Sequence, residues 1–227
     1  MKKRILLIDT ETAARERNAP PQSGLVYDLS FVVTDKKGRI YDEFTALVEE
    51  TYTDAPLMMG AFYARKHFTD YAPMLSRGDI RLMPWLDIVE HIRYTVCAFD
   101  INTVSAYNLD FDSQVIANTH ALHGDGAPVM PHPVKRLCIG QFAARTLMGR
   151  PTYRKQARAL DWITPAGNIR TGAQYCYRYL TRDPEFIEDH TGLSDCRIEA
   201  RILAECYRQK KRVPYNVPSG AFWKLAQ

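Results

Sequence analysis

The sequence predicts an α/β protein built on one mixed β-sheet, in which three antiparallel strands come first, parallel strands follow, and helices flank the sheet. Two observations support this prediction. Three extended, β-prone segments precede any strong helical spacing, and a helix, a short strand and another helix then follow in that order. A change from consecutive strands to alternating strands and helices is typical of a mixed sheet.

The first half of the chain supplies the three opening strands. Apolar and β-branched residues dominate each of them, and the turn-forming Asp35-Lys36-Lys37-Gly38 joins the second to the third as an antiparallel hairpin. A polar segment with a Pro-Pro pair separates the first strand from the second and predicts a loop. The strands are expected at 5–8, 25–34 and 40–48, and the loop at 15–24.

The second half supplies most of the helices. Apolar residues at helical spacing predict an amphipathic helix over 83–99 and another from near Phe111 to about His123, with a short strand at 103–107 between them. We assign 1–212 to one domain and 213–227 to a tail packed on it. The other expected elements are short helices and loops at 51–81, a loop at 128–133, a strand edge or turn and a helix at 136–149, a basic segment at 150–158, and helices at 172–180 and 194–211.

Composition narrows the class of protein. The chain has 227 residues and is 46% hydrophobic, which is ample for one core, and its net charge of +4 permits a polyanionic partner without requiring one. Its five cysteines form no C-x-x-C pair, so we expect neither a disulfide framework nor a zinc site, and we infer a reducing, cytoplasmic location. The apolar run after Met1-Lys2-Lys3-Arg4 is too short for a signal peptide or a membrane span.

Two acids follow the first apolar strand at a spacing that indicates a cation site. Side chains alternate along a strand, so Asp9 and Glu11 point to the same face. Two carboxylates held together on a buried strand repel each other unless they are protonated or bridged by a cation, and oxygen ligands favour Mg²⁺ or Mn²⁺. The alternative is that Asp-x-Glu simply ends a strand at the surface.

A third acid is expected where the strand at 103–107 meets the next helix. Asp112 shares a helical face with Val115 and Ile116, which must point at the sheet, whereas Asp110 lies outside that stripe. Asp112 is therefore predicted to point inward. The alternative is that it caps the helix and needs no metal.

The final helix carries a fourth acid. Its apolar stripe of Ile198, Ile202 and Cys206 continues one turn earlier at Asp195, and a buried Asp is costly without a partner such as a cation. Five residues upstream, His190 can approach the same point because Gly192 lets the segment bend. The alternative for His190 is a surface loop histidine without a role.

These motifs together resemble the DEDDh exonucleases of the RNase H-like superfamily, which include proofreading exonuclease subunits of bacterial DNA polymerases, RNase T and oligoribonuclease. The first family motif, Asp-x-Glu, is matched by Asp9-Thr10-Glu11, with Thr12 after it. The second family motif is an Asn, then any two residues, then Phe-Asp, and it is matched by Asn108-Leu109-Asp110-Phe111-Asp112. The third, a His, four residues and an Asp, is matched by His190 and Asp195. The resemblance runs from about Lys3 to Lys211.

The resemblance implies an RNase H-like sheet and a site with two divalent cations, Mg²⁺ or Mn²⁺. Asp9 would bridge the two ions, Glu11 and Asp195 would complete one site, and Asp112 would help to hold the other, partly through water. His190 would act as general base on the attacking water.

The implied function is a metal-dependent 3′-5′ exonuclease that releases 5′-mononucleotides from the 3′ end of single-stranded DNA. One alternative is an exoribonuclease for RNA tails or short oligonucleotides, because the same metal site serves both sugars. The other is a catalytically inactive nucleic-acid-binding protein on the same fold. A nucleic acid with a free 3′ end is the expected partner, with room for a polymerase or replication partner, and no oligomeric state is indicated.

Substrate contacts are expected from the motifs and from one basic segment. Besides the motif residues, Tyr153 is a candidate stacking platform, and several basic side chains are candidates for the phosphate backbone, unless they form a solvated face. Two features depart from the family pattern: Tyr107 stands where many members have a histidine, and 51–81 is longer than in the smallest members. The substrate contacts are expected from Thr10, Thr12, Asn108, Phe111, Tyr153, Arg154 and Lys155, with Lys66, Arg150 and Arg158 as further backbone candidates.

Overall fold

The computed structural model describes residues 4–14 and 20–227, and these form one α/β structure around a six-stranded sheet. The strand order across the sheet is β4-β3-β2-β1-β5-β6. β1, β2 and β3 pair antiparallel, β5 and β6 run parallel to β1, and β4 runs parallel to β3. The strands are β1 (Arg4–Ala13), β2 (Leu25–Thr34), β3 (Ile40–Val48), β4 (Arg81–Met83), β5 (Ile101–Ala106) and β6 (Lys135–Cys138).

The predicted sheet, with three antiparallel strands first and parallel strands after them, is confirmed. The short edge strand β4 lies at the boundary of 51–81, where we expected helices and loops, and was not predicted. It has three residues with largely exposed side chains, too few to produce an alternating pattern. Part of the loop expected at 15–24 lies outside the described residues, and Pro21–Ser23 forms the 3₁₀ turn η1.

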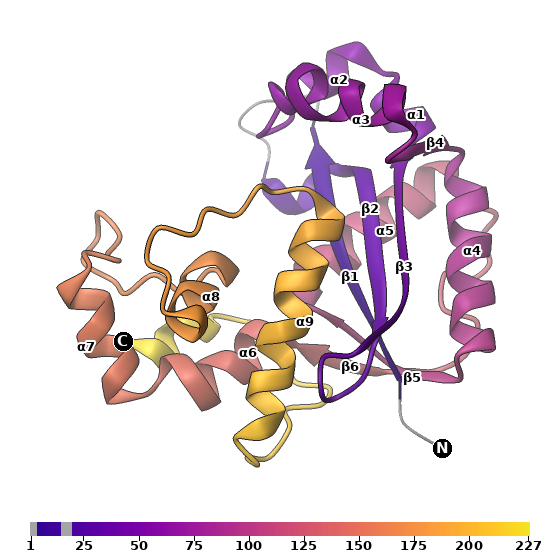
Figure 1. The fold of residues 1–227 in the computed structure, drawn as a ribbon. Coiled ribbons are helices and arrows are strands. Elements are labelled where there is room, and N and C mark those ends of the chain that lie inside the picture. The colour runs from indigo at the N-terminus through magenta and orange to yellow at the C-terminus, as the bar shows by residue number, and fades with distance from the viewer. Residues whose placement is uncertain (1–3, 15–19) are drawn as a thin grey trace.

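Long helices cover the two faces of the sheet (Figure 1). α9 (Gly192–Arg208) crosses one face against β1 and β2, while α4 (Trp85–Ala98) and α5 (Leu109–His123) lie on the other. α5 begins two residues before the predicted start, and α9 begins two residues earlier and ends three residues earlier than predicted. The central strands are buried on both sides, which explains their nearly continuous apolar sequences.

Two groups of short helices complete the fold. The segment between β3 and β4, which we call the insert (residues 49–80), sits above the sheet in Figure 1, and the second group lies to the side of α9. The basic segment 150–158 lies almost wholly in a helix, α7. The insert contains α1 (Glu49–Tyr52), α2 (Ala55–Met59), the π-helical turn η2 (His67–Tyr71) and α3 (Ala72–Arg77); the second group contains α6 (Ile139–Ala143), the π-helical turn η3 (Ala144–Met148), α7 (Pro151–Ala159) and α8 (Ala173–Thr181).

The C-terminal tail packs on the domain through its last turn, η4 (Phe222–Ala226). Phe222 is buried against Gly140, where an added Cβ would stand only 2.5 Å from its ring, and its ring meets Tyr107 edge-on. Ser219 also caps α5: its hydroxyl accepts a hydrogen bond from Asp110 N, and its own N–H donates to the Asp110 carboxylate at 2.6 Å. The tail therefore stabilises the start of the helix that carries Asp112.

None of the helices that the structure describes combines the length and the apolar composition needed to cross a bilayer. All five cysteines are free thiols, four of them buried.

Removing the Phe222 ring tests this packing. Phe222→Ala should lower the free energy of unfolding by about 3 kcal/mol or more, because it removes a buried ring and leaves a cavity. Trp223→Ala is the matched control, since the neighbouring ring is 47% exposed, and it should cost about 1 kcal/mol or less. Urea denaturation followed by circular dichroism measures both, and equal losses would show that the tail is only loosely attached.

Candidate active site

The two strand acids lie on the face of the sheet that α9 covers. In β1, Asp9 pairs with Ser30 of β2 and Glu11 with Asp28, so all four side chains share that face. The strand does not end at the acids as expected but continues to Ala13, with a register shift between Glu11 and Thr12. A paired strand holds both acids in fixed positions.

Asp112 reaches the site from the start of α5. It is buried, and one of its oxygens accepts a 2.9 Å hydrogen bond from the Thr10 hydroxyl, which lies between Asp9 and Glu11 in β1. Asp110 is exposed and pairs with Arg136 at 3.1 Å. These are the orientations that the helical spacing predicted, and the Thr10 hydroxyl contacts Asp112 where a substrate contact was expected.

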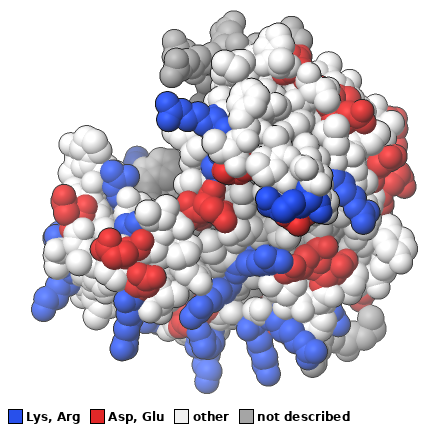
Figure 2. Space-filling view, turned by 45° about the horizontal axis from the view of Figure 1, so that its top comes forward, with Lys and Arg blue, Asp and Glu red and all other residues white. Residues whose placement is uncertain are grey.

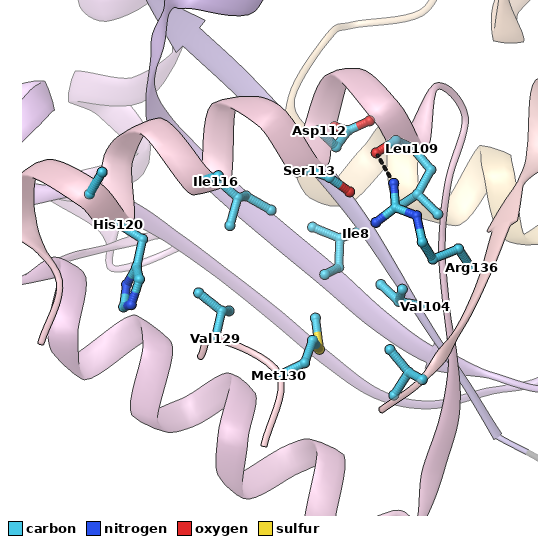
Figure 3. Close-up of a pocket in the computed structure, with 13 residues that line it drawn as sticks. Ile8, Val104, Leu109, Asp112, Ser113, Ile116, His120, Val129, Met130 and Arg136 are labelled. Carbon is cyan, nitrogen blue, oxygen red and sulfur yellow. Dashed lines mark hydrogen bonds between the residues drawn. The ribbon is translucent and has the colours of Figure 1, made fainter. Parts of the chain in front are cut away.

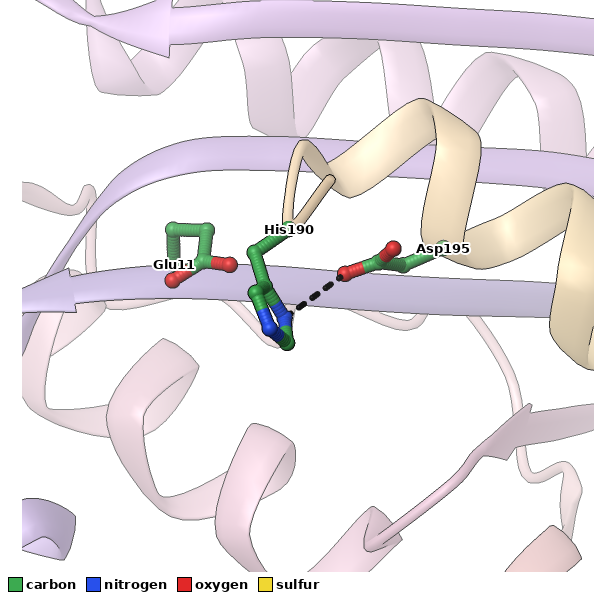
Figure 4. A group of neighbouring side chains, drawn as sticks. All are labelled: Glu11, His190 and Asp195. Carbon is green, nitrogen blue, oxygen red and sulfur yellow. Dashed lines mark ion pairs between the residues drawn. The ribbon is translucent and has the colours of Figure 1, made fainter. Parts of the chain in front are cut away.

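Glu11, His190 and Asp195 converge on one point (Figure 4). One ligand atom of each lies within 4.8 Å of the other two. His190 Nδ1 is 3.8 Å from Asp195 Oδ2 and also 3.8 Å from Glu188 Oε2. Among the described residues, this is the group of three whose positions suit a metal ion. Asp9 does not belong to that trio, but it lies near enough to Asp112, Asp195 and Glu11 for their negative charges to act on it.

A positive charge near these acids would stabilise their ionised forms. Burial raises the pKa of Glu11 to about 8, with a contribution from the negative charge of Asp28, and burial next to Glu188 and Glu11 raises the pKa of Asp195 to about 9. Burial and the neighbouring acids also raise the pKa of Asp9 well above its ordinary value. Asp195 Oδ1 is buried without a hydrogen-bond partner among the described residues. A divalent cation would remove the repulsion and occupy that orphaned oxygen, so these residues fit a metal site.

The insert orders the loop that carries His190. The ring of Tyr63 stacks on the imidazole, with centroids 4.7 Å apart and planes 18° from parallel. Lys66 Nζ donates hydrogen bonds to the carbonyl oxygens of Asp189 and His190, the latter at 2.6 Å. His190 has a φ of 54°, an uncommon conformation for a non-glycine residue that the surrounding contacts must maintain. A role in ordering the His190 loop was not predicted for Tyr63, and Lys66 was predicted only as a contact to the phosphate backbone.

Asp28 ties three parts of the site together and was also missed. Its buried carboxylate accepts hydrogen bonds from the Tyr71 hydroxyl at 2.7 Å, Ser30 Oγ at 3.0 Å and Gly192 N at 3.1 Å. A Cβ at Gly192 would lie 2.7 Å from Ser30 Oγ, so only glycine lets α9 approach the sheet this closely. Asp28 thus joins β2 to the insert and to the start of α9.

Two further buried acids, Glu188 and Glu199, face the same region. Glu188 precedes His190 in the loop and was not predicted as a site residue; burial raises its pKa to about 7. Glu199 lies one turn after Asp195 on α9 and is 2% exposed. A signal for Glu199 was present, because its spacing places it on the same helical stripe as Asp195 and Ile202.

Some of the predicted substrate contacts are accessible in the structure and others are not. Tyr153 cannot be a stacking platform: its ring is fully buried, and its hydroxyl donates to Arg170 O at 2.7 Å. Arg154 donates to carbonyl oxygens of the tail, Leu225 and Ala226, so its guanidinium is already engaged. Thr12, Asn108 and Phe111 are half-buried, Phe111 against the core, and Lys155 and Arg158 are exposed.

One face of the molecule is mixed in charge. Figure 2 shows acidic side chains within a hollow, with Lys and Arg on either side of it.

A separate cavity of about 470 Å³ lies along α5, bounded by Ile8, Ile116 and Met130 (Figure 3). Asp112 lies at its edge, but most of its lining is apolar, and Glu11, His190 and Asp195 are not part of it. Of the catalytic candidates, only Asp112 therefore borders this pocket.

Comparisons with known proteins identify the fold. No family model and no curated protein matches the sequence. Among solved structures, the nuclease domain of 3′hExo, a DEDDh family member, bound to rAMP, is 14% identical with a TM-score of 0.65, covering 96% of this chain and 98% of that one. The 3′-exonuclease that recognises a histone mRNA stem-loop is 13% identical with a TM-score of 0.62, covering 91% and 82%.

Exonuclease I of E. coli, in a complex with single-stranded DNA, is 14% identical with a TM-score of 0.56, covering 93% of this chain and 41% of that one. This chain therefore corresponds to about two-fifths of Exonuclease I but to nearly all of the 3′hExo nuclease domain. The protein has the fold of the DEDDh exonucleases, as the three sequence motifs predicted.

The raised carboxylate pKa values predict how stability depends on pH. Asp and Glu side chains in the unfolded chain have pKa values near 4, whereas burial raises the pKa of folded Glu11 to about 8 and that of folded Asp195 to about 9. Between pH 4 and these higher values, the folded state therefore binds more protons than the unfolded state. The melting temperature of metal-free protein should therefore fall as pH rises from 5 to 8. Mg²⁺ or Mn²⁺ should raise it, most strongly at pH 8, by binding the native state.

Asp195→Asn should flatten the pH dependence, raise the metal-free melting temperature at pH 8 and reduce the shift caused by metal. Asp183→Asn, at an exposed turn, serves as the control. Differential scanning fluorimetry with and without EDTA measures all three proteins. A wild-type melting temperature that rises over this pH range, or ignores millimolar metal, would contradict a preformed cation site.

Proposed function

We propose that this protein is a metal-dependent 3′-5′ exonuclease that hydrolyses single-stranded DNA and releases 5′-mononucleotides. The observation that carries the proposal is the convergence of Glu11, His190 and Asp195 within 4.8 Å, with Asp9 and Asp112 beside them. These five residues come from the three motifs by which the sequence resembles DEDDh exonucleases, and the fold is that of the same enzymes.

The acids provide the cation site. Glu11, Asp195 and Asp9 would hold one ion, and Asp9 and Asp112 would hold the other. The Thr10 hydroxyl maintains the position of Asp112. When bound, the two ions supply positive charge that activates water and stabilises the leaving 3′ oxygen. All of these ligands are carboxylates, which suits Mg²⁺ or Mn²⁺.

His190 would take the proton from the attacking water. Burial and the positive charge of Lys66 lower its pKa, so the neutral imidazole that can accept a proton is present near neutral pH. The carboxylate of Glu188, 3.8 Å from Nδ1, faces the imidazolium that forms. The stacked Tyr63 ring fixes the plane of the imidazole during the transfer.

The structural neighbours support a nucleic-acid substrate without choosing the sugar. Exonuclease I has been determined with single-stranded DNA, and 3′hExo with rAMP. RNA is therefore a second candidate, favoured by the near-complete coverage of the 3′hExo nuclease domain. A contact to a 2′-hydroxyl would distinguish the two substrates.

The activity is tested with 5′-labelled single strands of DNA and RNA of the same sequence, with Mg²⁺, Mn²⁺ or EDTA. We expect a ladder that shortens from the 3′ end on DNA, requires metal and yields 5′-mononucleotides. Asp112→Asn should abolish most of this activity because it removes a buried acid of the site, while Asp110→Asn, its exposed neighbour, should retain it.

Faster shortening of RNA than of DNA would favour the second candidate. Absence of shortening on either strand, in protein that binds metal and is folded, would reject the enzyme and favour the inactive binding protein. Equal losses in the two Asp variants would show that the inward position of Asp112 has no catalytic meaning.

The pH dependence of the rate tests His190. The single-turnover rate should rise with pH and level off once the imidazole is neutral, with a midpoint below the ordinary histidine value because the pKa is lowered. His190→Ala should lose about 10²–10⁴-fold, the usual contribution of a positioned base, and His190→Gln should not restore the pH-dependent limb.

Lys66→Met should move the midpoint to higher pH, since it removes a positive charge that lowers the pKa of His190. Quench-flow measurements of the single-turnover rate at saturating metal and DNA give these pH profiles. If His190→Ala keeps both the rate and the profile of wild type, His190 is only a loop residue.

A further inference from the structure

Glu199 is a buried acid that the proposed mechanism does not use. It lies on α9 one turn after Asp195, and its side chain is 2% exposed. Its Oε2 has no hydrogen-bond partner among the described residues. Such an oxygen costs free energy in the native state unless something absent from the protein chain binds it.

The groups around Glu199 belong to the cation site. Asp9 experiences the charge of Glu199 more strongly than that of any other acid, and Glu199 in turn experiences mainly Asp112 and Asp195. A hydrogen bond from the backbone of Tyr107, at the end of β5, provides the favourable contact. No basic group is among the main electrostatic neighbours of Glu199.

The packing of α9 explains why the side chain points there. Gly192 seats the start of the helix on Asp28 and Ser30, and Cys196 Sγ lies 3.7 Å from the Leu7 carbonyl oxygen, two residues before Asp9. Glu199 follows Asp195 by four residues, so both side chains project from the same face of α9 toward β1. Glu199 therefore lies one turn farther along α9 from the His190 loop than Asp195 does.

Stability alone does not account for an acid at this position. Its neighbours along the stripe, Ile198 and Ile202, are apolar and buried, and an apolar side chain would satisfy the helix without an orphaned oxygen. Burial next to Asp112 and Asp195 raises the pKa of Glu199 well above its ordinary value, which reflects this cost.

We propose that Glu199 is a fifth carboxylate of the cation site, offering an oxygen to the cation that Asp9 and Asp112 hold. The inference rests on the proposed metal site and deepens it. The three acids come from α9, β1 and α5, so they surround the cation from three elements. The second cation would thus have a third protein carboxylate in place of a solvent ligand, and it would bind more tightly.

The test is a calorimetric titration of metal-free protein with Mn²⁺, which measures affinity and stoichiometry without substrate. Wild type should bind two ions. Glu199→Gln keeps the size of the side chain and should weaken one of the two by about 10–100-fold, the usual cost of losing a supporting group at a metal site. Glu205→Gln, on the same helix but hydrogen-bonded to Gln209, should leave both affinities unchanged.

The outcomes separate this inference from the proposed function. If Glu199→Gln binds both ions as wild type does, while Asp195→Asn does not, the inference is wrong and the cation site stands. If wild type binds no Mn²⁺, the cation site fails, and the inference fails with it. A purely structural Glu199 would change the metal-free melting temperature but not the affinities. Should the Gln variant not fold, Glu199→Met fills the same volume without polarity and is expected to lose the same ion.

Discussion

Mutual repulsion among buried carboxylates is the constraint on which the rest of this structure depends. Asp9, Asp195 and Glu199 are buried near one another, and their pKa values rise first because burial disfavours a charged carboxylate and then because each negative charge disfavours the others. A flexible chain would relieve this repulsion by moving apart. The paired strand β1 and the long helix α9 prevent that movement, so the free energy stored in the site is available to a cation.

The supporting contacts share one design, in which each functional side chain is held by an element distant in sequence. Thr10 of β1 holds Asp112 of α5, and the tail residue Ser219 caps the helix that carries it. Tyr63 and Lys66 of the insert hold the His190 loop. The candidate site therefore depends on the complete fold, because contacts between elements distant in sequence hold Asp112 and the His190 loop in place.

Much of the fold could be predicted from sequence because periodicity reports burial directly. The hairpin, the inward orientation of Asp112 and the long helices followed from alternation and helical spacing. The short helices and loops expected at 51–81 are present in the insert, but their bounds and the edge strand β4 could not be predicted, because short elements carry too few residues for a period to emerge. Tyr153 was misread: the basic residues around it hid its four-residue spacing to buried Ala157.

The contacts of Asp28 join two parts of the candidate site that lie in different elements. The carboxylate joins Tyr71 of the insert to Gly192, two residues after His190, whereas Asp9 and Glu11 belong to the centre of the sheet. A local opening that breaks this junction would free the histidine loop and leave the strand acids in place. On the proposed assignments, that form would keep its cation ligands and lack its base, and hydrogen exchange at the amides of the loop would report how often it forms.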